Sequence, residues 1–394
     1  MIFGNRLLRE VTQQDILALV NAGMREHLQL EYKSASYEQN DNGRREFLQD
    51  VCMFANSAGG VLLVGVTELR GDDGQPSGAP DPDAELGVAS PNPEAALLAY
   101  DARVVACIQD RLPVESHAVR IENGRFVLVF RIPNSIRKPH CVRFQGHVYF
   151  PSRRDRNRYE MDLREIKEQT MRAASQLDRA EDLLGRELNS HVPVGYPLLL
   201  LAQIPIFNRG IPLDITDDNV RREIEVFDVF ATDHPAERRA PTYGFAGLQR
   251  TAAGYDVTLH RNGMLTLKAE FPGGQLPEGR NWWQFELARI DVLIRGFAAR
   301  AKQFYLASKL DSPSLLGAQI LTSMHLRAEW NFGRSHAEVA PNENRRFIFP
   351  VIEIGGPSDD IDRAIRPICD HIHQTFGLAQ SNWFRADGTW HDPR

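Results

Sequence analysis

The sequence predicts an α+β fold that is divided over two domains of a 394-residue chain. Residues 27–33 alternate between apolar and polar side chains, as a half-buried strand does. Residues 44–56 repeat apolar side chains at helical spacing, and the apolar run 61–66 follows as a buried strand. Residues 198–376 then show both strand and helix patterns, which favours a second α+β domain.

The composition is typical of a soluble globular protein, with 42% hydrophobic and 25% charged residues. The longest apolar stretch, residues 198–207, is about half the length of a membrane helix. The charged N-terminus shows no targeting segment, so we expect a cytoplasmic protein with no membrane partner. The cysteines are far apart without a CxxC pair, which predicts reduced thiols: Cys52, Cys107, Cys141 and Cys369. Since the net charge is −6, nucleic-acid binding would need a local basic patch.

Further elements are expected in the first domain, residues 1–170. A segment rich in Gly, Pro and Asp, residues 69–93, predicts a mobile surface loop. A helix is expected over about 94–110, and residues 116–132 predict a hairpin that turns at Asn123-Gly124. Residues 142–150 predict a last strand.

A charged helix over residues 162–188 is expected at the end of the first domain. We predict a helical linker at 171–193 and a second α+β domain at 194–394, to which no motif assigns a role. The patterns of this second domain predict strands at 198–206, 242–248, 254–260, 263–270, 313–324 and 346–354, and helices at 217–228, 282–307 and 360–376.

Three sequence pieces in the first domain occur in a fixed order. They are Glu31-Tyr32-Lys33 on a strand, FANSAGG from Phe54 to Gly60 at a helix end, and Gly65-Val66-Thr67-Glu68 after an apolar strand. In this order, with the later hairpin, the pieces resemble the Schlafen AlbA-2 domain, over about residues 10–170. The resemblance implies a mixed sheet with packed helices and a role in nucleic-acid binding.

The resemblance also implies a site made of three carboxylates, Glu26, Glu31 and Glu68. In Schlafen ribonucleases three such acids form a metal-dependent endoribonuclease site that cleaves transfer and ribosomal RNA. The third acid of the family is often Asp, whereas this chain has Glu68. Converging carboxylates suit Mg²⁺ or Mn²⁺, and Lys33 would assist by contacting an acid or a phosphate.

These same acids can also be read as ordinary surface charge. Glu26 and Glu68 would then be solvated ends of elements, and Glu31 and Lys33 an ion pair on an edge strand. Spacing alone favours this reading. With the resemblance added, the two readings stay open.

A basic patch with interleaved aromatic residues lies between residues 137 and 158. Such a patch suits phosphate contacts and base stacking. The alternative is a strand edge that arginines keep soluble. The residues we expect to bind nucleic acid are Arg137, Lys138, Arg143, Tyr149, Arg153, Arg154, Arg156 and Arg158.

Asn56, Gly59 and Gly60 form a turn that could approach a phosphate. The turn runs from helix to strand and has no following Lys-Ser/Thr, so it is not a Walker loop and does not support ATP binding. A sharp turn that needs glycine is the favoured interpretation.

The leading hypothesis is a metal-dependent endoribonuclease that acts on RNA such as transfer RNA. The alternative is a non-catalytic regulatory module that binds DNA, RNA or a nucleotide, and a third hypothesis is a component of anti-phage defence. Vertebrate Schlafen cores contain two AlbA-2 lobes and this chain shows one FANxxGG motif. The resemblance therefore implies a homodimer, through helix 162–188 or the C-terminal domain.

Overall fold

The computed structural model divides into two compact units, Met1–Ser175 and Gln176–Arg394. The boundary lies inside helix α4 (Leu163–Asn189), which occupies most of the segment expected as a linker. None of the described residues belongs to a helix long and apolar enough to cross a membrane. The structure describes residues 2–3, 7–71, 74–192, 197–206, 213–227, 242–243, 247–252, 255–271, 282–308, 310, 313–323, 325–330, 335–339, 345–355 and 360–391.

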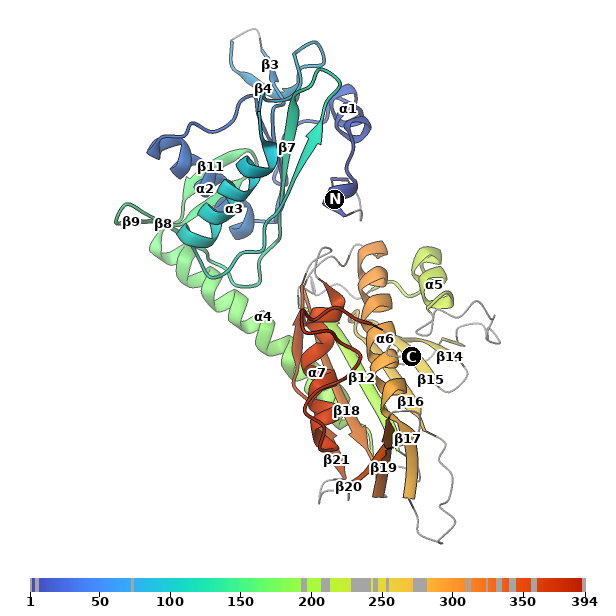
Figure 1. Ribbon diagram of the computed structural model, residues 1–394. Coiled ribbons are helices and arrows are strands. Elements are labelled where there is room, and N and C mark those ends of the chain that lie inside the picture. Colours follow the sequence, from blue (N-terminus) through green and yellow to red (C-terminus); the bar gives the residue numbers. More distant parts are fainter. Residues whose placement is uncertain are drawn as a thin grey trace. The chain divides into compact units, whose positions relative to one another are not determined.

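The first unit contains short helices and short strands before α4 (Figure 1). In chain order they are η1 (Leu8–Glu10), α1 (Gln13–Asn21), β1 (Leu30–Lys33), α2 (Asp41–Asn56), β2 (Gly60–Val64), β3 (Glu68–Arg70), β4 (Pro76–Pro80), α3 (Pro93–Cys107), β5 (Ile108–Gln109), β6 (Glu115–Arg120), β7 (Phe126–Ile132), β8 (Cys141–Phe144), β9 (His147–Tyr149), β10 (Pro151–Arg154) and β11 (Asn157–Glu160).

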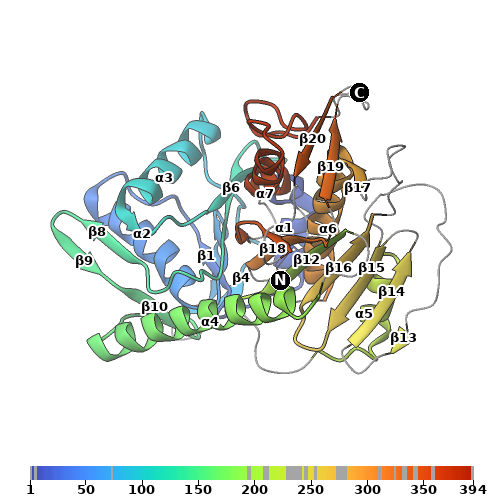
Figure 2. The same cartoon turned by 90° about the horizontal axis from the view of Figure 1, so that it is seen from below.

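A mixed four-stranded sheet forms the centre of this unit, in the order β1-β2-β7-β6. Strand β1 is parallel to β2, and the other neighbours are antiparallel. Along β2, Leu62 and Val64 pack with residues of α2 and α3, whereas Val61 and Leu63 pack with residues of α1. Helices therefore cover both faces of the sheet (Figures 1 and 2). The α+β prediction for this unit is confirmed.

Helix α2 joins the sheet to the hairpins that follow it in the chain. At its C-terminal end, the Asn56 side chain donates to the carbonyls of His140 and Pro151, both at 2.9 Å, and accepts from His140 N at 2.7 Å. Asn56 is buried, so these bonds satisfy backbone groups that water cannot reach. The expected single strand 142–150 is instead β8 and β9, which reverse at Gln145 and Gly146 with positive φ.

The glycine pair after α2 is required by close backbone approach. Gly59 has φ +66°, and a Cβ there would lie 2.5 Å from Asn134 N. A Cβ on Gly60 would lie 2.6 Å from Gln29 O. The turn therefore brings α2 against the end of β7 and the start of β1, as glycine alone permits.

The segment 69–93 differs from the mobile loop that we expected. Its strand β4 pairs antiparallel with β3, and further backbone bonds join Gly87 to Gly65 and Val88 to Phe126. Ala79 and Val88 are buried. The composition suggested mobility because the segment has few apolar residues, but hydrogen bonds from glycine backbone groups hold it in place.

The second unit is built on a large sheet of order β13-β14-β15-β16-β12-β18-β21, with β22 paired beside β21 on β18, and the α+β prediction holds for it too. Its elements are β12 (Leu198–Pro205), α5 (Asp218–Glu225), β13 (Thr242–Tyr243), β14 (Gly247–Ala252), β15 (Tyr255–His260), β16 (Leu265–Glu270), β17 (Trp282–Glu286), α6 (Leu287–Ala307), β18 (Ser314–Leu321), β19 (His325–Trp330), β20 (Ser335–Val339), β21 (Arg346–Ile348), β22 (Ile352–Ile354) and α7 (Ile361–Thr375).

Helices α6 and α7 bury their apolar residues against one face of this sheet. On the other face, a Cβ on Gly317 would lie 2.8 Å from Leu188 Cδ1, so the glycine lets α4 approach closely. The helix expected over 282–307 begins only at Leu287, because residues 282–286 form β17, parallel to β19. Three of these five residues are aromatic, which favours a strand. Parts of the expected helix 217–228 and strand 242–248 lie outside the described residues.

We predict that Asn56→Ala lowers the free energy of unfolding of the first unit by about 3–5 kcal/mol, because three buried backbone groups lose their partners. Urea denaturation monitored by circular dichroism measures the change. Asn42→Ala is the control, since Asn42 is exposed near the start of the same helix, and it should shift stability by less than about 0.5 kcal/mol. Equal effects of the two substitutions would contradict the role given to Asn56.

Candidate functional site

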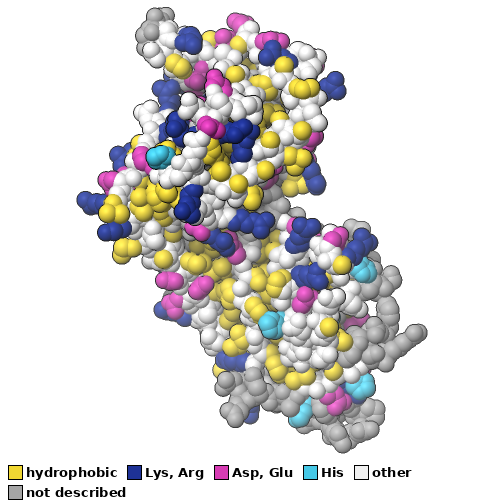
Figure 3. Space-filling view, turned by 60° about the vertical axis from the view of Figure 1, so that its left-hand side comes forward, with side chains coloured by type: hydrophobic (Ala, Val, Ile, Leu, Met, Phe, Trp, Pro, Cys, Tyr) yellow, Lys and Arg dark blue, Asp and Glu magenta, His cyan; other side chains and the backbone are white. Residues whose placement is uncertain are grey.

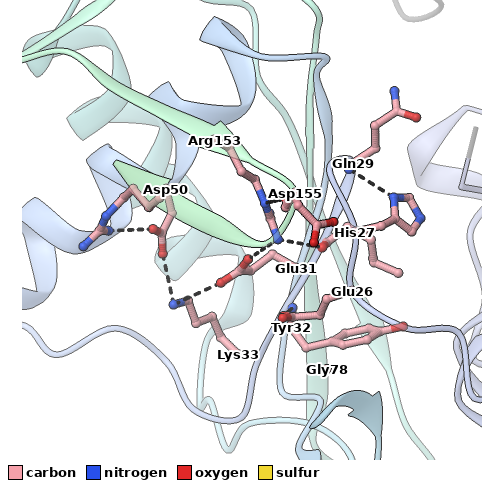
Figure 4. A network of polar contacts seen from close by, with 12 residues as sticks. Glu26, His27, Gln29, Glu31, Tyr32, Lys33, Asp50, Gly78, Arg153 and Asp155 are labelled. Carbon is pink, nitrogen blue, oxygen red and sulfur yellow. Dashed lines mark hydrogen bonds and ion pairs between the residues drawn. The ribbon is translucent and has the colours of Figure 1, made fainter. Parts of the chain in front are cut away.

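Glu31 is held between two cations at the edge of the sheet. One carboxylate oxygen lies 2.8 Å from Arg153 Nη2 and the other 3.4 Å from Lys33 Nζ (Figure 4). The Arg153 side chain is fully buried, and its guanidinium lies over the Phe54 ring at 5.1 Å. Burial raises the pKa of Glu31, and the charges of Arg153 and Lys33 oppose that rise. The alternation along β1 explains the position of Glu31, because Leu30 and Tyr32 point to the opposite face and are buried.

A second buried carboxylate, Asp50 on α2, extends this network. Its oxygens lie 3.2 Å from Lys33 Nζ and 2.8 Å from Arg158 Nη1, and it also accepts from the Tyr37 hydroxyl at 2.8 Å. Burial alone would lower the pKa of Lys33, but the charges of Asp50 and Glu31 raise it above its ordinary value. Sequence analysis missed Asp50. The signal was present, since Asp50 lies three residues after Phe47 on the buried face of the helix.

Glu26 and Glu68 meet at Gly78. The Gly78 amide donates to Glu68 Oε2 at 2.9 Å, and the Gly78 carbonyl accepts from Glu26 N at 2.6 Å. Glu26 Oε1 in turn accepts from Tyr32 N at 2.7 Å. Burial, followed by the charge of Glu31, raises the pKa of Glu26 to about 7, and Glu68 adds to the rise. Glu26 is therefore close enough to both other acids to be repelled by them.

The arrangement of these acids does not fit a metal ion bound by all three. Both oxygens of Glu31 are paired with cations, and one oxygen each of Glu26 and Glu68 accepts from a backbone amide. Among the described residues, no group of three or more His, Cys, Asp or Glu side chains is placed to hold a metal. The expected Mg²⁺ or Mn²⁺ site therefore stays a prediction, and we derive no chemical step through a metal.

The basic residues of the patch divide into a buried and an exposed group. Arg153 is buried against Glu31, and Lys138 is largely buried with its ammonium on the Ser57 carbonyl at the end of α2. Burial, and to a lesser degree Arg172, lowers the pKa of Lys138 to about 8. Arg153 and Lys138 therefore pair with groups inside the first unit. The exposed group consists of Arg137, Arg143, Arg154, Arg156 and Arg158.

Three of the exposed arginines belong to the hairpin β10–β11. Arg158 faces Asp50, as described above. Arg154 lies over the Tyr159 ring at 4.6 Å and pairs with Glu165 at 2.5 Å, and Arg156 donates to the Ser77 carbonyl at 3.0 Å. On the face of the molecule drawn in Figure 3, Lys and Arg side chains are scattered among hydrophobic ones. In the sequence, arginines are concentrated in the hairpin, at positions 153, 154, 156 and 158.

Comparison with known families identifies the first unit. The family model described as Schlafen, AlbA_2 matches residues 26–162. Residues 26–162 match this family model, and we call this segment the AlbA_2 domain. The resemblance drawn from Glu31-Tyr32-Lys33 and FANSAGG is thereby confirmed for this part of the chain. The family supports a function related to nucleic acids.

A solved structure and the curated proteins were also compared with the chain. The solution NMR structure of the N-terminal domain of a RecG-related protein from Nitrosomonas europaea, described as an ATP-dependent DNA helicase, covers 39% of this chain and 93% of that one. Its TM-score is 0.28 at 20% identity. No curated protein matches the chain.

The contacts of the remaining predicted residues of the AlbA_2 domain are as follows. Tyr149 is partly buried and packs against the core around α2. Asn56, Gly59 and Gly60 form the turn described above, with backbone and the Phe54 ring close to the glycines. Sequence analysis also missed His27, an exposed residue beside Glu26, whose Nδ1 accepts from Gln29 N at 3.1 Å. Burial, followed by the charge of Arg153, lowers the pKa of His27.

We predict that Glu26→Gln makes the AlbA_2 domain more stable above pH 7. The pKa of Glu26 rises from 4.5 to about 7 on folding, so the folded state holds a proton that the unfolded state has lost. Stability therefore falls as pH rises from about 4.5 to about 7, and the glutamine removes this fall while keeping an acceptor for Tyr32 N. Because Glu26 is partly exposed, we expect a gain of about 1 kcal/mol.

Urea denaturation of wild type and variant at several pH values between 4.5 and 8 measures this gain. Glu122→Gln is the control, since Glu122 is exposed in the turn between β6 and β7. A difference between wild type and Glu26→Gln that does not grow with pH would contradict the prediction.

Proposed function

We propose that the AlbA_2 domain binds the backbone of a nucleic acid, RNA or DNA, through the hairpin β10–β11. The observation that supports this most is the way in which the hairpin divides its arginines. Arg153 and Arg158 face each other across the two strands, the first fully buried against Glu31 and the second 39% exposed and paired with the buried Asp50. Arg154 and Arg156 stay at the surface.

The outer arginines can exchange their present partners for phosphates. Arg154 is 73% exposed in its pair with Glu165, and exposed ion pairs contribute little stability. Its guanidinium lies over the Tyr159 ring, and a phosphate that displaced Glu165 would meet the edge of the guanidinium. Tyr159 adds a ring on which a base could stack. A chain with a net charge of −6 gains its attraction for nucleic acid locally, at this hairpin.

We predict that Arg154→Ala combined with Arg156→Ala weakens binding to transfer RNA and to DNA alike. Each lost phosphate contact should reduce the slope of log K against log salt by about 0.7–0.9, hence by about 1.5–2 for the pair. Fluorescence anisotropy at several salt concentrations gives the slope. Arg164→Ala is the control, because Arg164 is 85% exposed on the neighbouring helix α4 outside the hairpin. A slope that the double substitution leaves unchanged would exclude the hairpin as the binding element.

A second candidate function is cleavage of RNA at the three acids. The supporting observation is the raised pKa of Glu26, which allows its carboxyl group to exchange a proton near neutral pH. Arg153, Lys33 and the exposed His27 lie around the same carboxylates and could stabilise a phosphodiester during reaction (Figure 4).

We predict that purified protein cleaves transfer RNA and that Glu26→Gln reduces the cleavage rate at least about tenfold without weakening binding. Gel electrophoresis after incubation with Mg²⁺, with Mn²⁺ and with a chelator measures the rate and its dependence on metal. Glu122→Gln again serves as the control. RNA that stays intact under all three conditions but is retained in a gel shift would favour the non-catalytic regulatory module instead.

The proposed homodimer and the role in anti-phage defence stay predictions. The anisotropy measurements with transfer RNA and with DNA also show which of the two the AlbA_2 domain binds more tightly.

A further inference from the structure

Helix α3 exposes a face that is almost entirely apolar. Its inner face is ordinary, since Leu97, Tyr100 and Val104 are buried in the core of the first unit. Seven of its residues are exposed, and the one charged residue among them is Glu94 at the N-terminal end. The other six are Ala95, Leu98, Ala99, Ala102, Val105 and Ala106. We call these six residues the α3 face.

Comparison with the neighbouring helix shows that this face is unusual. The neighbouring helix α2 covers the same side of the sheet, and its exposed residues are all polar: Asp41, Asn42, Arg44 and Glu46. On α3, Leu98 is 68% and Val105 78% exposed. A surface helix normally places charged and polar residues outward, so a helix that is apolar on both sides is expected to be covered on both.

We propose that the α3 face binds the α3 face of a second copy of this chain, with the two helices antiparallel. The pattern is symmetric about Ala102. Leu98 and Ala99 precede it by four and three residues, and Val105 and Ala106 follow it by three and four. A twofold axis at Ala102 therefore places Leu98 opposite Val105 of the second copy, and Ala99 opposite Ala106 of the second copy.

This self-complementarity is the reason for choosing a second copy as the occupant. The larger side chains meet along one side of the helix pair, and the alanines on the other side allow the backbones to approach closely. The exposed charge of the helix, Glu94, is two turns from the axis. The partly exposed Asp101 and Arg103, which flank Ala102, already bond to Ser116 and Gln39 of the same unit. The proposal is independent of nucleic-acid binding, and it differs from our expectation that α4 or the second unit forms the interface.

The size of the α3 face determines how strongly two copies are expected to associate. Six residues per copy is well below the roughly 20–30 residues a side of a standard interface. We therefore expect weak and reversible association, with a dissociation constant on the order of 10–100 μM. Most of the protein is monomeric at low micromolar concentration, and dimers form where the chain is concentrated.

Sedimentation velocity of the full chain between about 1 and about 300 μM tests the proposal. The wild-type sedimentation coefficient should rise with concentration. Leu98→Lys and Val105→Glu should each raise the dissociation constant at least tenfold, because a charge then faces an apolar side chain of the second copy. Circular dichroism verifies that these exposed substitutions leave the fold intact. Met171→Lys is the matched control, since Met171 is 72% exposed on α4, and it should leave association unchanged.

The antiparallel register is tested by mixing the two variants. In an equimolar mixture, Lys at position 98 of one chain faces Glu at position 105 of the other, and the second contact keeps Leu98 and Val105. The mixture should therefore associate although neither variant does so alone. The proposal is overturned if wild type stays monomeric throughout, if the single variants associate as wild type does, or if the mixture fails to associate.

Discussion

The buried ion pair between Glu31 and Arg153 organises the first unit. It joins an edge strand near the start of the domain to a hairpin about 120 residues later, with Arg153 fully buried and Glu31 15% exposed. Loss of Glu31 would leave the buried guanidinium of Arg153 without a carboxylate, which typically costs about 3–5 kcal/mol, whereas loss of Arg153 would leave Glu31 paired with Lys33 alone. Arg153 also donates to the carbonyls of Leu30 and Asp155, so its guanidinium fixes the position of the hairpin as well as the charge of Glu31.

Helix α2 contributes two further residues, Asp50 and Asn56, that connect β1 and the later hairpins. Asp50, near the middle of the helix, forms ion pairs with Lys33 and Arg158. Asn56, at its end, forms hydrogen bonds with the backbone of His140 and Pro151. Asp50 and Asn56 thus tie β1 and the hairpin β10–β11 to one helix. A hairpin held in this way would lose less conformational entropy in the proposed phosphate contacts.

The sequence predicts the AlbA_2 elements well because their signals are local. FANSAGG contains a buried helix end and a turn that needs glycine, and the strands β1 and β2 show clear apolar patterns. It does not predict which charges are buried. Arg153 and Lys138 have the same residue types as the exposed arginines around them, and their burial depends on Glu31 and on the end of α2, far away in the chain.

Two other differences between the predicted and the observed structure also arise from contacts between residues far apart in the chain. Segment 69–93 looks mobile because composition reports apolar content, whereas Gly78 and Gly87 hold it by backbone bonds that composition does not record. Residues 282–286 are consistent with either a helix or a strand until β19 provides a parallel neighbour. Long-range pairing decides both cases, and a local pattern contains no information on it.

The bond between Glu26 and the Tyr32 amide has a consequence for solubility. Strand β1 is at the edge of the central sheet, where an unpaired amide would offer a template to a strand from another molecule. The Glu26 carboxylate accepts a hydrogen bond from the Tyr32 amide, and the Arg153 guanidinium donates one to the carbonyl of Leu30. Side chains of the candidate site thereby close the sheet against intermolecular strand addition. These two hydrogen bonds block strand pairing at Tyr32 and Leu30 whether or not a ligand is bound.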